Sequence, residues 1–413
     1  MSTAPASPSA KPASNLPLQG VRVIDMSTVL FGPFASRWLA DYGADVIKVE
    51  SPAGDSSRTT GLAREPGMAT GQHMVNRNKR SVVLDLKQPA GHDALLRMLE
   101  SADVLMHNIR PQKIRALGLD AAALRPRFPR LIHANLVGFS KDGPYGGRPA
   151  YDDIIQGACG LADLMRRQTG EVQYLPTVAA DKISGLIGAQ AILMALVGRG
   201  RTGLGTEVEV PMFESMVDFS LLEHLGGQVF IPPLAPPGYA RVLNRWRRPY
   251  RTLDGHVCVM PYTTEQWQRF FKEAGAPEMA ADPRFANMKL RTQNIAELYA
   301  RLGELIANRT SKDWLETCQR LDIPAGPVNT LEALPDDPHL RAVGTFQLVP
   351  DADSGGAVQL TRPGVRFDGE APTLRAAHRL GQDTREVLRE AGFDEAQIDA
   401  LVKTGAAQQA TGY

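Results

Sequence analysis

The sequence is poor in cysteine, in net charge and in long hydrophobic runs. Its 413 residues contain three cysteines, none spaced as CxxC, which excludes a disulfide framework and fits a reducing cytoplasm. Lys and Arg number 46 against 45 Asp and Glu, so we expect no broad basic surface for nucleic acid. No apolar run reaches the roughly 18 residues that span a bilayer, so we expect no membrane partner. The 8 histidines show no HExxH or HxH spacing, which disfavours a metal site.

The remaining composition is that of a globular protein. Hydrophobic residues make up 43% and charged residues 22%, which excludes a wholly disordered, collagen-like or coiled-coil chain. The length predicts two domains. Residues 1–15 are rich in Ala, Ser and Pro without an apolar centre, so we predict a disordered tail and no signal peptide.

From residue 16 to about 140, short β-rich runs alternate with helical stretches. This alternation predicts an α/β fold with a parallel sheet, whose ligands bind beyond the carboxyl ends of the strands. The first strand-to-helix loop, 27–32, lacks GxGxxG, which disfavours a nicotinamide dehydrogenase. The expected strands are 21–26, 45–50, 81–86, 103–108 and 131–137, with helices at 34–42, 89–101 and 112–117.

The second half contains a strongly apolar helix and a separate unit. The helix at 181–197 opens with an acid and is followed by a predicted break at 198–205. The separate unit, at about 250–330, contains a hairpin with Asp254-Gly255 as its turn. The other expected elements are a strand at 208–211 and helices at 212–225, 265–274, 293–308, 311–320 and 383–402.

Asp181 is the first candidate for chemistry. As an acid at a helix start it can be an N-cap or first-turn residue. The alternative is a carboxylate nucleophile, because Ser184, Gly185, Gly188 and Ala189 allow close backbone approach. Helix N–H groups there would lower its pKa and hold an oxyanion.

A second candidate is the acidic segment Tyr151-Asp152-Asp153. It follows a Gly/Pro-rich stretch, so it reads either as a solvated turn or as a substrate-positioning loop. Cys159 lies nearby in apolar, Gly-rich sequence without a basic neighbour. We therefore predict a core thiol there and not a nucleophile.

Two basic segments have open interpretations. Residues 76–80 (NRNKR) are either solvated or hold a phosphate. Residues 241–251 contain five arginines around Trp246 and Tyr250. They are either a solvated charge run or a binding site for a carboxylate or phosphate, which the planar guanidinium suits.

Taken together, these segments resemble the class III CoA-transferase family, which includes formyl-CoA transferase, carnitine CoA-transferase and α-methylacyl-CoA racemase. The resemblance begins at Pro17 with PLQGVRVIDMSTVLFGPFASRWLADYGADVIKVE and covers nearly the whole chain beyond the tail. It continues through NRNKRSVVLDLK, DVLMHNIRP, LVGFSKDGPYGGRPAYDDIIQG, the helix from Asp181, GPVN and RLGQDTREVL.

The resemblance implies a fold and an organisation. It implies an α/β fold with a large Rossmann-like domain and a smaller α+β domain, in an interlocked homodimer. The large, discontinuous domain would comprise 16–225 and 331–413, and the small domain with its linkers 226–330. The C-terminal helix would return to the first domain.

The resemblance also implies site residues. The family's catalytic aspartate matches Asp181, which would form an aspartyl-CoA thioester. Lys113 and Arg115 are phosphate candidates from their spacing after Asn108. The matching CoA-binding positions are Val29, Leu30, Phe31, Leu84, Asp85, Leu86, Lys87, Asn108, Ile109, Arg110, Tyr151 and Asp152.

The sequence departs from the family at three places. Ser51 replaces a basic residue that follows IKVE in some members, so Arg58 or another residue must serve. The stretch 241–255 lacks the glycine run of formyl-CoA transferase, which puts a formyl or oxalyl substrate in doubt. Tyr151 stands where the racemase branch has a histidine, and tyrosine is too weak an acid to replace it easily.

We therefore predict a cytoplasmic CoA-transferase that moves CoA from an acyl-CoA to a free carboxylic acid, with no tightly bound cofactor and no metal. Arg247 and Arg248 suggest a dicarboxylate such as succinate. The alternatives are a racemase or epimerase of α-substituted acyl-CoA and a non-catalytic CoA-binding protein.

Overall fold

The structure is a computed structural model that describes residues 16–351 and 356–410; the predicted tail at 1–15 lies outside the described residues. The chain divides into two compact units. The larger comprises the described parts of 1–155, 178–216 and 339–413, and the smaller comprises 156–177 and 217–338. This division differs from the predicted boundaries because 156–177, 217–225 and 331–338 make most of their contacts within the smaller unit.

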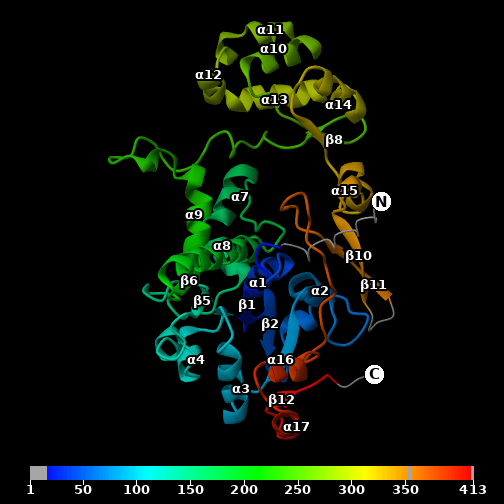
Figure 1. Ribbon diagram of the computed structural model, residues 1–413. Helices are drawn as coiled ribbons and strands as arrows, with labels where there is room; N and C mark the ends of the chain where they lie inside the picture. Colours follow the sequence, from blue (N-terminus) through cyan, green and yellow to red (C-terminus); the bar gives the residue numbers. More distant parts are fainter. Residues whose placement is uncertain (1–15, 352–355, 411–413) are drawn as a thin grey trace, which may run out of the picture. The chain divides into compact units, whose positions relative to one another are not determined.

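A seven-stranded sheet forms the centre of the larger unit (Figure 1). Its order is β12-β3-β2-β1-β4-β5-β6, with β1 to β6 parallel and β12 antiparallel to β3. Val23 and Ile24 point to opposite faces and are both fully buried, which explains the continuous apolar runs. The order of β1 to β6 is that of a doubly wound sheet, whose switch point lies between β1 and β4. The strands are β1 Arg22–Asp25, β2 Asp45–Glu50, β3 Arg80–Leu84, β4 Val104–His107, β5 Ile132–Val137, β6 Glu207–Pro211 and β12 Ala407–Gln408.

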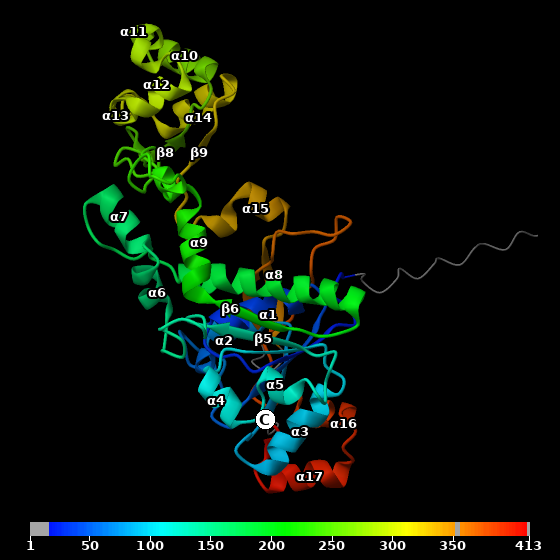
Figure 2. The ribbon, with the colours of Figure 1, turned by 90° about the vertical axis from the view of Figure 1, so that its left-hand side faces the viewer.

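Helices cover both faces of this sheet (Figure 2). Helices α1 (Phe31–Asp41) and α8 (Ala179–Thr202) pack together on one face, and α3 (Pro89–Leu99) packs with α16 (Thr384–Glu390) on the other. Helix α17 (Glu395–Lys403) leads into β12, so the C-terminal segment returns to the first domain, as the resemblance implies. The larger unit also contains α2 Thr70–Asn76, α4 Pro111–Ala116, α5 Ala121–Leu124 and the antiparallel hairpin β10 Phe346–Asp351 and β11 Gly356–Thr361.

Helix α8 is longer than predicted and packs unusually closely on α1. The glycine-rich stretch predicted as a break remains helical to Thr202. A Cβ on Gly185 would lie 2.9 Å from Phe34 Cδ1 and 3.0 Å from the Phe31 carbonyl oxygen, so a side chain there would force α1 or the Phe34 ring to shift. By length and composition α8 could also cross a bilayer, contrary to the expectation that no such run exists. Core helices of globular domains meet the same criterion, and α8 has a packed neighbour.

The smaller unit has its own hydrophobic core. Its centre is aromatic, with Trp267, Phe270, Phe271 and Trp314 all buried. The predicted hairpin is present as β7 (Tyr250–Arg251) and β8 (His256–Val259), and β9 (Ala325–Pro327) completes a three-stranded sheet. The predicted helices here are α10 Thr264–Glu273, α13 Ile295–Ile306 and α14 Ser311–Arg320, with short helices α11 Pro277–Ala281 and α12 Met288–Gln293 between them. Helix α7 (Leu161–Thr169) belongs to this unit, whereas α6 Asp152–Ala158, α9 Met212–His224 and α15 Pro338–Ala342 span the boundaries.

Two glycine-to-alanine changes in α8 test its packing. Gly185→Ala places a methyl group against α1, whereas Gly198 has no neighbouring atom within 4 Å of its Cβ position. Gly198→Ala should stabilise the protein by about 0.5–1 kcal/mol through helix propensity. Gly185→Ala should be about 2 kcal/mol less stable than Gly198→Ala because of overpacking. Urea unfolding measures both, and equal effects would contradict the close approach.

Candidate active site

Asp181 lies in the first turn of α8, at the carboxyl-terminal side of the sheet. The N-cap is Val178, so of the two positions that the simpler interpretation allowed, N-cap and first turn, Asp181 occupies the first turn. The Asp181 backbone N–H donates to Asp152 Oδ1 at 3.1 Å. Asp152, at the start of α6, thus satisfies one of the unpaired N–H groups of the α8 terminus. This contact brings two predicted site residues together.

The environment of Asp181 favours its neutral form. Burial, together with the negative charges of Asp152 and Asp153, raises the pKa of Asp181 from 3.8 to about 7. The expectation that helix N–H groups would lower this pKa is therefore wrong, because desolvation and two like charges outweigh the helix terminus. A carboxylate with a pKa near 7 is more basic than an ordinary one and is still substantially ionised at neutral pH.

The close packing of α8 places Asp181 beside the first loop of the sheet. A Cβ on Gly185, one turn after Asp181, would lie 3.0 Å from the Phe31 carbonyl oxygen at the start of α1. Residues 27–30 connect β1 to that point. The first turn of α8 and the loop after β1 are therefore neighbours.

A pocket of about 240 Å³ lies at the switch point of the sheet. Its walls come from the loops that follow β1, β4 and β5, which end at the same edge because the strands are parallel. This is the usual ligand position in such a sheet. The lining residues are Thr28, Val29, Asn108, Arg110, Pro111, Val137, Gly138, Phe139, Gly147, Arg148, Pro149, Ala150 and Tyr151.

The pocket brings together some of the predicted CoA-binding residues and not others. Val29, Asn108, Arg110 and Tyr151 line it. Asn108 also joins two loops, since it accepts from the Thr28 N–H at 2.9 Å and donates to the Thr28 carbonyl at 2.8 Å. The remaining predicted positions lie outside the pocket: Leu30 and Phe31 at the start of α1, Leu84 at the end of β3, Asp85, Leu86 and Lys87 after β3, Ile109 after β4, the exposed Lys113 and Arg115 on α4, and Asp152 at the start of α6.

Arg148 is a pocket residue that sequence reasoning did not single out. Its guanidinium lies 4.5 Å from the centre of the Tyr145 ring, and it lines the pocket with Arg110. The available signal was a basic residue in a Gly/Pro-rich loop directly after a predicted strand. Such loops carry binding residues more often than the strands do.

The basic segment 76–80 has a structural role that neither interpretation foresaw. Arg77 is fully buried and pairs with Asp41 at 2.7 Å. Lys79 is 2% exposed and pairs with Asp25 at 3.1 Å. Buried cations with buried partners are neither solvated nor directed at a phosphate.

Arg58 also has a buried partner. It was considered as a substitute for the basic residue that is missing at Ser51. It is 4% exposed and makes two hydrogen bonds to Glu50, at 2.7 and 2.6 Å. In this bidentate pairing the guanidinium of Arg58 donates through two nitrogens to one buried carboxylate. Arg58 is therefore used inside the protein by Glu50, the residue before Ser51.

Arg247, Arg248 and Cys159 lie in the smaller unit. Arg248 is exposed, and its guanidinium lies 5.0 Å from the centre of the Trp246 ring. Arg247 is partly buried. Cys159 is 5% exposed, which agrees with the predicted core thiol.

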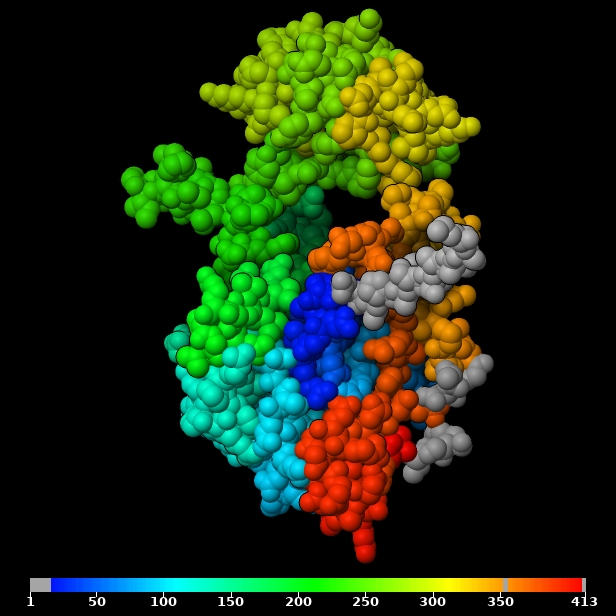
Figure 3. Space-filling view, viewed as in Figure 1, coloured from blue at the N-terminus to red at the C-terminus, as the bar shows by residue number. Residues whose placement is uncertain are grey.

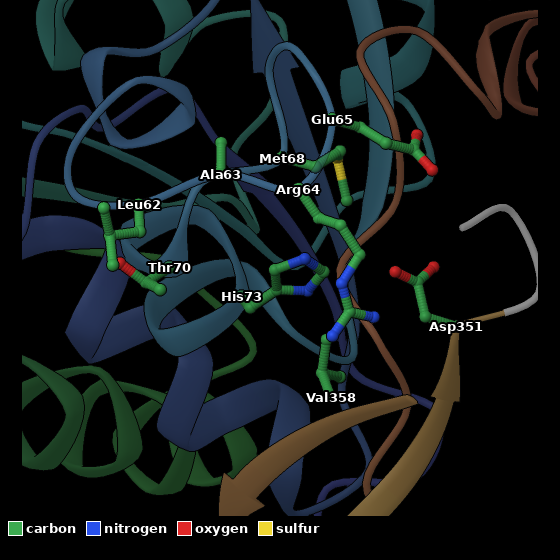
Figure 4. A pocket seen from close by; sticks show the side chains of 9 residues that line it. All are labelled: Leu62, Ala63, Arg64, Glu65, Met68, Thr70, His73, Asp351 and Val358. Atoms are coloured by element: carbon green, nitrogen blue, oxygen red, sulfur yellow. The ribbon is translucent and has the colours of Figure 1, made fainter. Parts of the chain in front are cut away.

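A second cavity of the larger unit contains none of the predicted site residues (Figure 4). It lies between α2 and the β10–β11 hairpin, with His73, Arg64 and Asp351 around it. Burial lowers the pKa of His73, which favours a neutral imidazole. Within 16–351 and 356–410, no group of three His, Cys, Asp or Glu side chains is arranged to hold a metal ion.

Replacing the Asp181 charge should stabilise the protein at alkaline pH. The pKa of about 7 in the fold exceeds the ordinary 3.8, so the folded state binds the proton more tightly. The contribution of this tighter proton binding to the free energy of unfolding is fully present below about pH 4 and is lost as the pH rises through 7. Asp181→Asn escapes this loss, and its free energy of unfolding should exceed the wild-type value by about 2 kcal/mol at pH 8, allowing for partial exposure.

Urea unfolding at pH 5 and pH 8 measures this gain. Asp218→Asn, which removes an exposed charge on α9 that does not act on Asp181, is the control and should change stability by less than about 0.5 kcal/mol. A gain for Asp181→Asn that is the same at both pH values would contradict the raised pKa.

Several proteins named as CoA-transferases are similar to this chain. The chain is 33% identical to "Acyl-CoA transferase" of Fusarium pseudograminearum, over 94% of this chain and 88% of that protein. It is 34% identical to "Probable fatty acyl-CoA transferase Rv3272" of Mycobacterium tuberculosis, over 80% and 86%. It is 31% identical to "Succinate--glutarate CoA-transferase" of Agrobacterium fabrum, over 91% and 95%.

Solved structures give the same result for the fold. A CAIB/BAIF family protein from Brucella suis matches with a TM-score of 0.77 at 30% identity, over 92% of this chain and 100% of that one. The orthorhombic form of Rv3272 also matches with a TM-score of 0.77 at 30% identity, over 89% and 98%. The family model described as CoA-transferase family III matches residues 18–384, and the chain therefore belongs to CoA-transferase family III.

Proposed function

We propose that this CoA-transferase moves CoA from an acyl-CoA donor to a free carboxylic acid through a thioester on Asp181. The observation that carries the proposal is the carboxylate of Asp181, which has a pKa of about 7 and lies beside the switch-point loops. Asp152 supports the assignment, because it holds the Asp181 backbone and directly follows the pocket residue Tyr151.

The first half of the reaction transfers CoA to the enzyme. The Asp181 carboxylate attacks the thioester carbonyl, the C–S bond breaks, and a mixed anhydride and CoA thiolate form. The thiolate then attacks the Asp181 carbonyl carbon of the anhydride. The C–O bond to the donor acyl group breaks, which releases the donor as a carboxylate and leaves CoA on Asp181.

The second half reverses these steps with a new acid. The acceptor carboxylate attacks the Asp181 thioester, giving a second mixed anhydride and free thiolate. The thiolate attacks the acceptor's carbonyl carbon, so the new acyl-CoA leaves and the Asp181 carboxylate is restored. Protons and electrons balance without a redox or metal cofactor, and the CoA thioester is a substrate.

The predicted CoA-binding residues fit one extended ligand. Leu84 ends β3 and Asp85 to Lys87 follow it, and the pocket extends to the loop after β5. Four strand spacings of roughly 4.8 Å separate β3 from β5, a span of about 19 Å along one edge. Arg110, Lys113 and Arg115 supply cations beside this edge for the phosphates.

A dicarboxylate acceptor is the narrower proposal. Arg247 and Arg248 offer cations for a second carboxylate, as the sequence suggested. The Agrobacterium fabrum relative is named for succinate and glutarate, which are both dicarboxylic acids. The interlocked homodimer and the cytoplasmic location stay predictions from the resemblance and from the cysteine content.

A covalent CoA adduct on Asp181 tests the mechanism. After incubation with acyl-CoA, intact-mass and peptide analysis should find CoA on the peptide containing Asp181, and hydroxylamine should inactivate the enzyme only when acyl-CoA is present. Asp181→Asn should lose at least about 1,000-fold in kcat, because the nucleophile is gone. Asp153→Asn should still form the adduct. An active Asp181→Asn enzyme would overturn the proposal.

Neutralising the arginine pair tests the acceptor. Arg247→Gln with Arg248→Gln should raise the KM for a dicarboxylate such as succinate about tenfold or more, the worth of one charge-assisted contact. The KM for a monocarboxylate of similar length should stay within about twofold. Arg245→Gln, which removes another arginine beside Trp246, is the matched control. Equal effects on both kinds of acid would refute the assignment.

A further inference from the structure

The segment 27–30, between β1 and α1, has an unfavourable backbone at a functional position. Val29 has a φ of +71°, in the left-handed region that β-branched residues rarely adopt. The same residue lines the switch-point pocket. Such strain persists only where the surrounding structure imposes it, and it concentrates at functional sites.

One buried ion pair holds this segment from both sides. Asp55 Oδ1 accepts from the Val29 backbone N–H at 3.0 Å. Lys48 Nζ donates to the Ser27 carbonyl at 2.7 Å and lies 2.9 Å from Asp55 Oδ2. The Lys48–Asp55 pair therefore binds the Ser27 carbonyl on one side of Thr28 and the Val29 N–H on the other.

Other side chains hold the rest of the segment. Asp25 Oδ1 accepts from the Ser27 N–H at 2.9 Å, and Asn108 binds both backbone groups of Thr28. Gly32 leaves room for the turn, since a Cβ there would overlap the Ser27 side chain. Every residue from Ser27 to Val29 is thus anchored through its backbone by a side chain.

The anchoring charges form a balanced network inside the unit. Three carboxylates face three cations, and each of the six residues is at most 5% exposed. Burial alone would lower the pKa of Lys48, but Asp25 and Asp55 raise it, so the amine stays charged. The members are Asp25, Glu50, Asp55, Lys48, Arg58 and Lys79.

We infer that Lys48 and Asp55 are positioning residues that pre-form the 27–30 segment for the CoA thioester. Neither lines the switch-point pocket, so both act through the backbone of Val29 and Ser27. The inference deepens the proposed function and rests on it, because it takes the pocket as the CoA site. If the segment is already in its binding conformation, the apparent affinity for CoA is not reduced by the need to order it.

Asp55→Asn is the decisive variant. The carboxylate uses one oxygen for Val29 and the other for Lys48, whereas an amide has a single acceptor oxygen and must give up one contact. The matched control is Asp41→Asn, whose carboxylate also uses both oxygens on buried partners, Arg77 and Asn78. Asp41 and Asp55 are similarly buried, at 1% and 4% exposed.

Calorimetry with free CoA gives the readout, alongside thermal unfolding. Asp55→Asn should raise the Kd for CoA about tenfold, as when the competent population falls to a tenth. Asp41→Asn should keep the Kd within about twofold even where its loss of Tm is as large. Equal changes in Kd, or an unchanged Kd in Asp55→Asn, would overturn the inference.

Hydrogen exchange on the wild-type protein keeps the inference testable if Asp55→Asn does not fold. The Thr28 and Val29 amides should be protected without CoA, and rapid exchange that slows only on CoA binding would refute pre-formation. Failure of the proposed function is distinguishable, because it would appear as no CoA binding or no Asp181 adduct in the wild type. Normal adduct formation with an unchanged Kd in Asp55→Asn would refute the inference alone.

Discussion

The approach of α8 to α1 is the contact on which the proposed active site depends. At Gly185 the two helices are so close that a β-carbon would meet the backbone of Phe31. The contact places the first turn of α8 beside the loop after β1, at the edge where the parallel strands end. Asp181 therefore lies partly buried beside two other acids, and this environment makes its carboxylate more basic.

The near-zero net charge of the chain has a structural explanation. Many of its cations are used inside the larger unit, where Lys48, Arg58, Arg77 and Lys79 each pair with a buried carboxylate. At the pocket, cations come from Arg110 and Arg148, in the segments that follow β4 and β5. A few charge-assisted contacts in a concave site are sufficient for CoA without a basic surface.

Local patterns predicted most of the larger unit. The apolar runs of β1 to β5 and the helices between them are encoded over a few residues each, so their positions follow from sequence within a few residues. The family motifs also picked out Val29, Asn108 and Tyr151, which line one pocket in the structure, and Asp181, whose assignment as the nucleophile stays a prediction. The continuation of α8 to Thr202 was not predicted, because glycine lowers helix propensity without forbidding a helix. The partners of Arg58, Arg77 and Lys79 lie 8 to 54 residues away, and the sign of the Asp181 pKa shift depends on burial, which no short pattern contains.

A crystal structure of the protein with CoA bound would test the central claim most directly, namely that the switch-point edge and Asp181 form one site. The account predicts the CoA sulfur within about 3.5 Å of the Asp181 carboxylate, with the pantetheine arm passing the left-handed Val29. CoA bound elsewhere, for example in the cavity beside His73, with Asp181 out of reach of the sulfur, would contradict it.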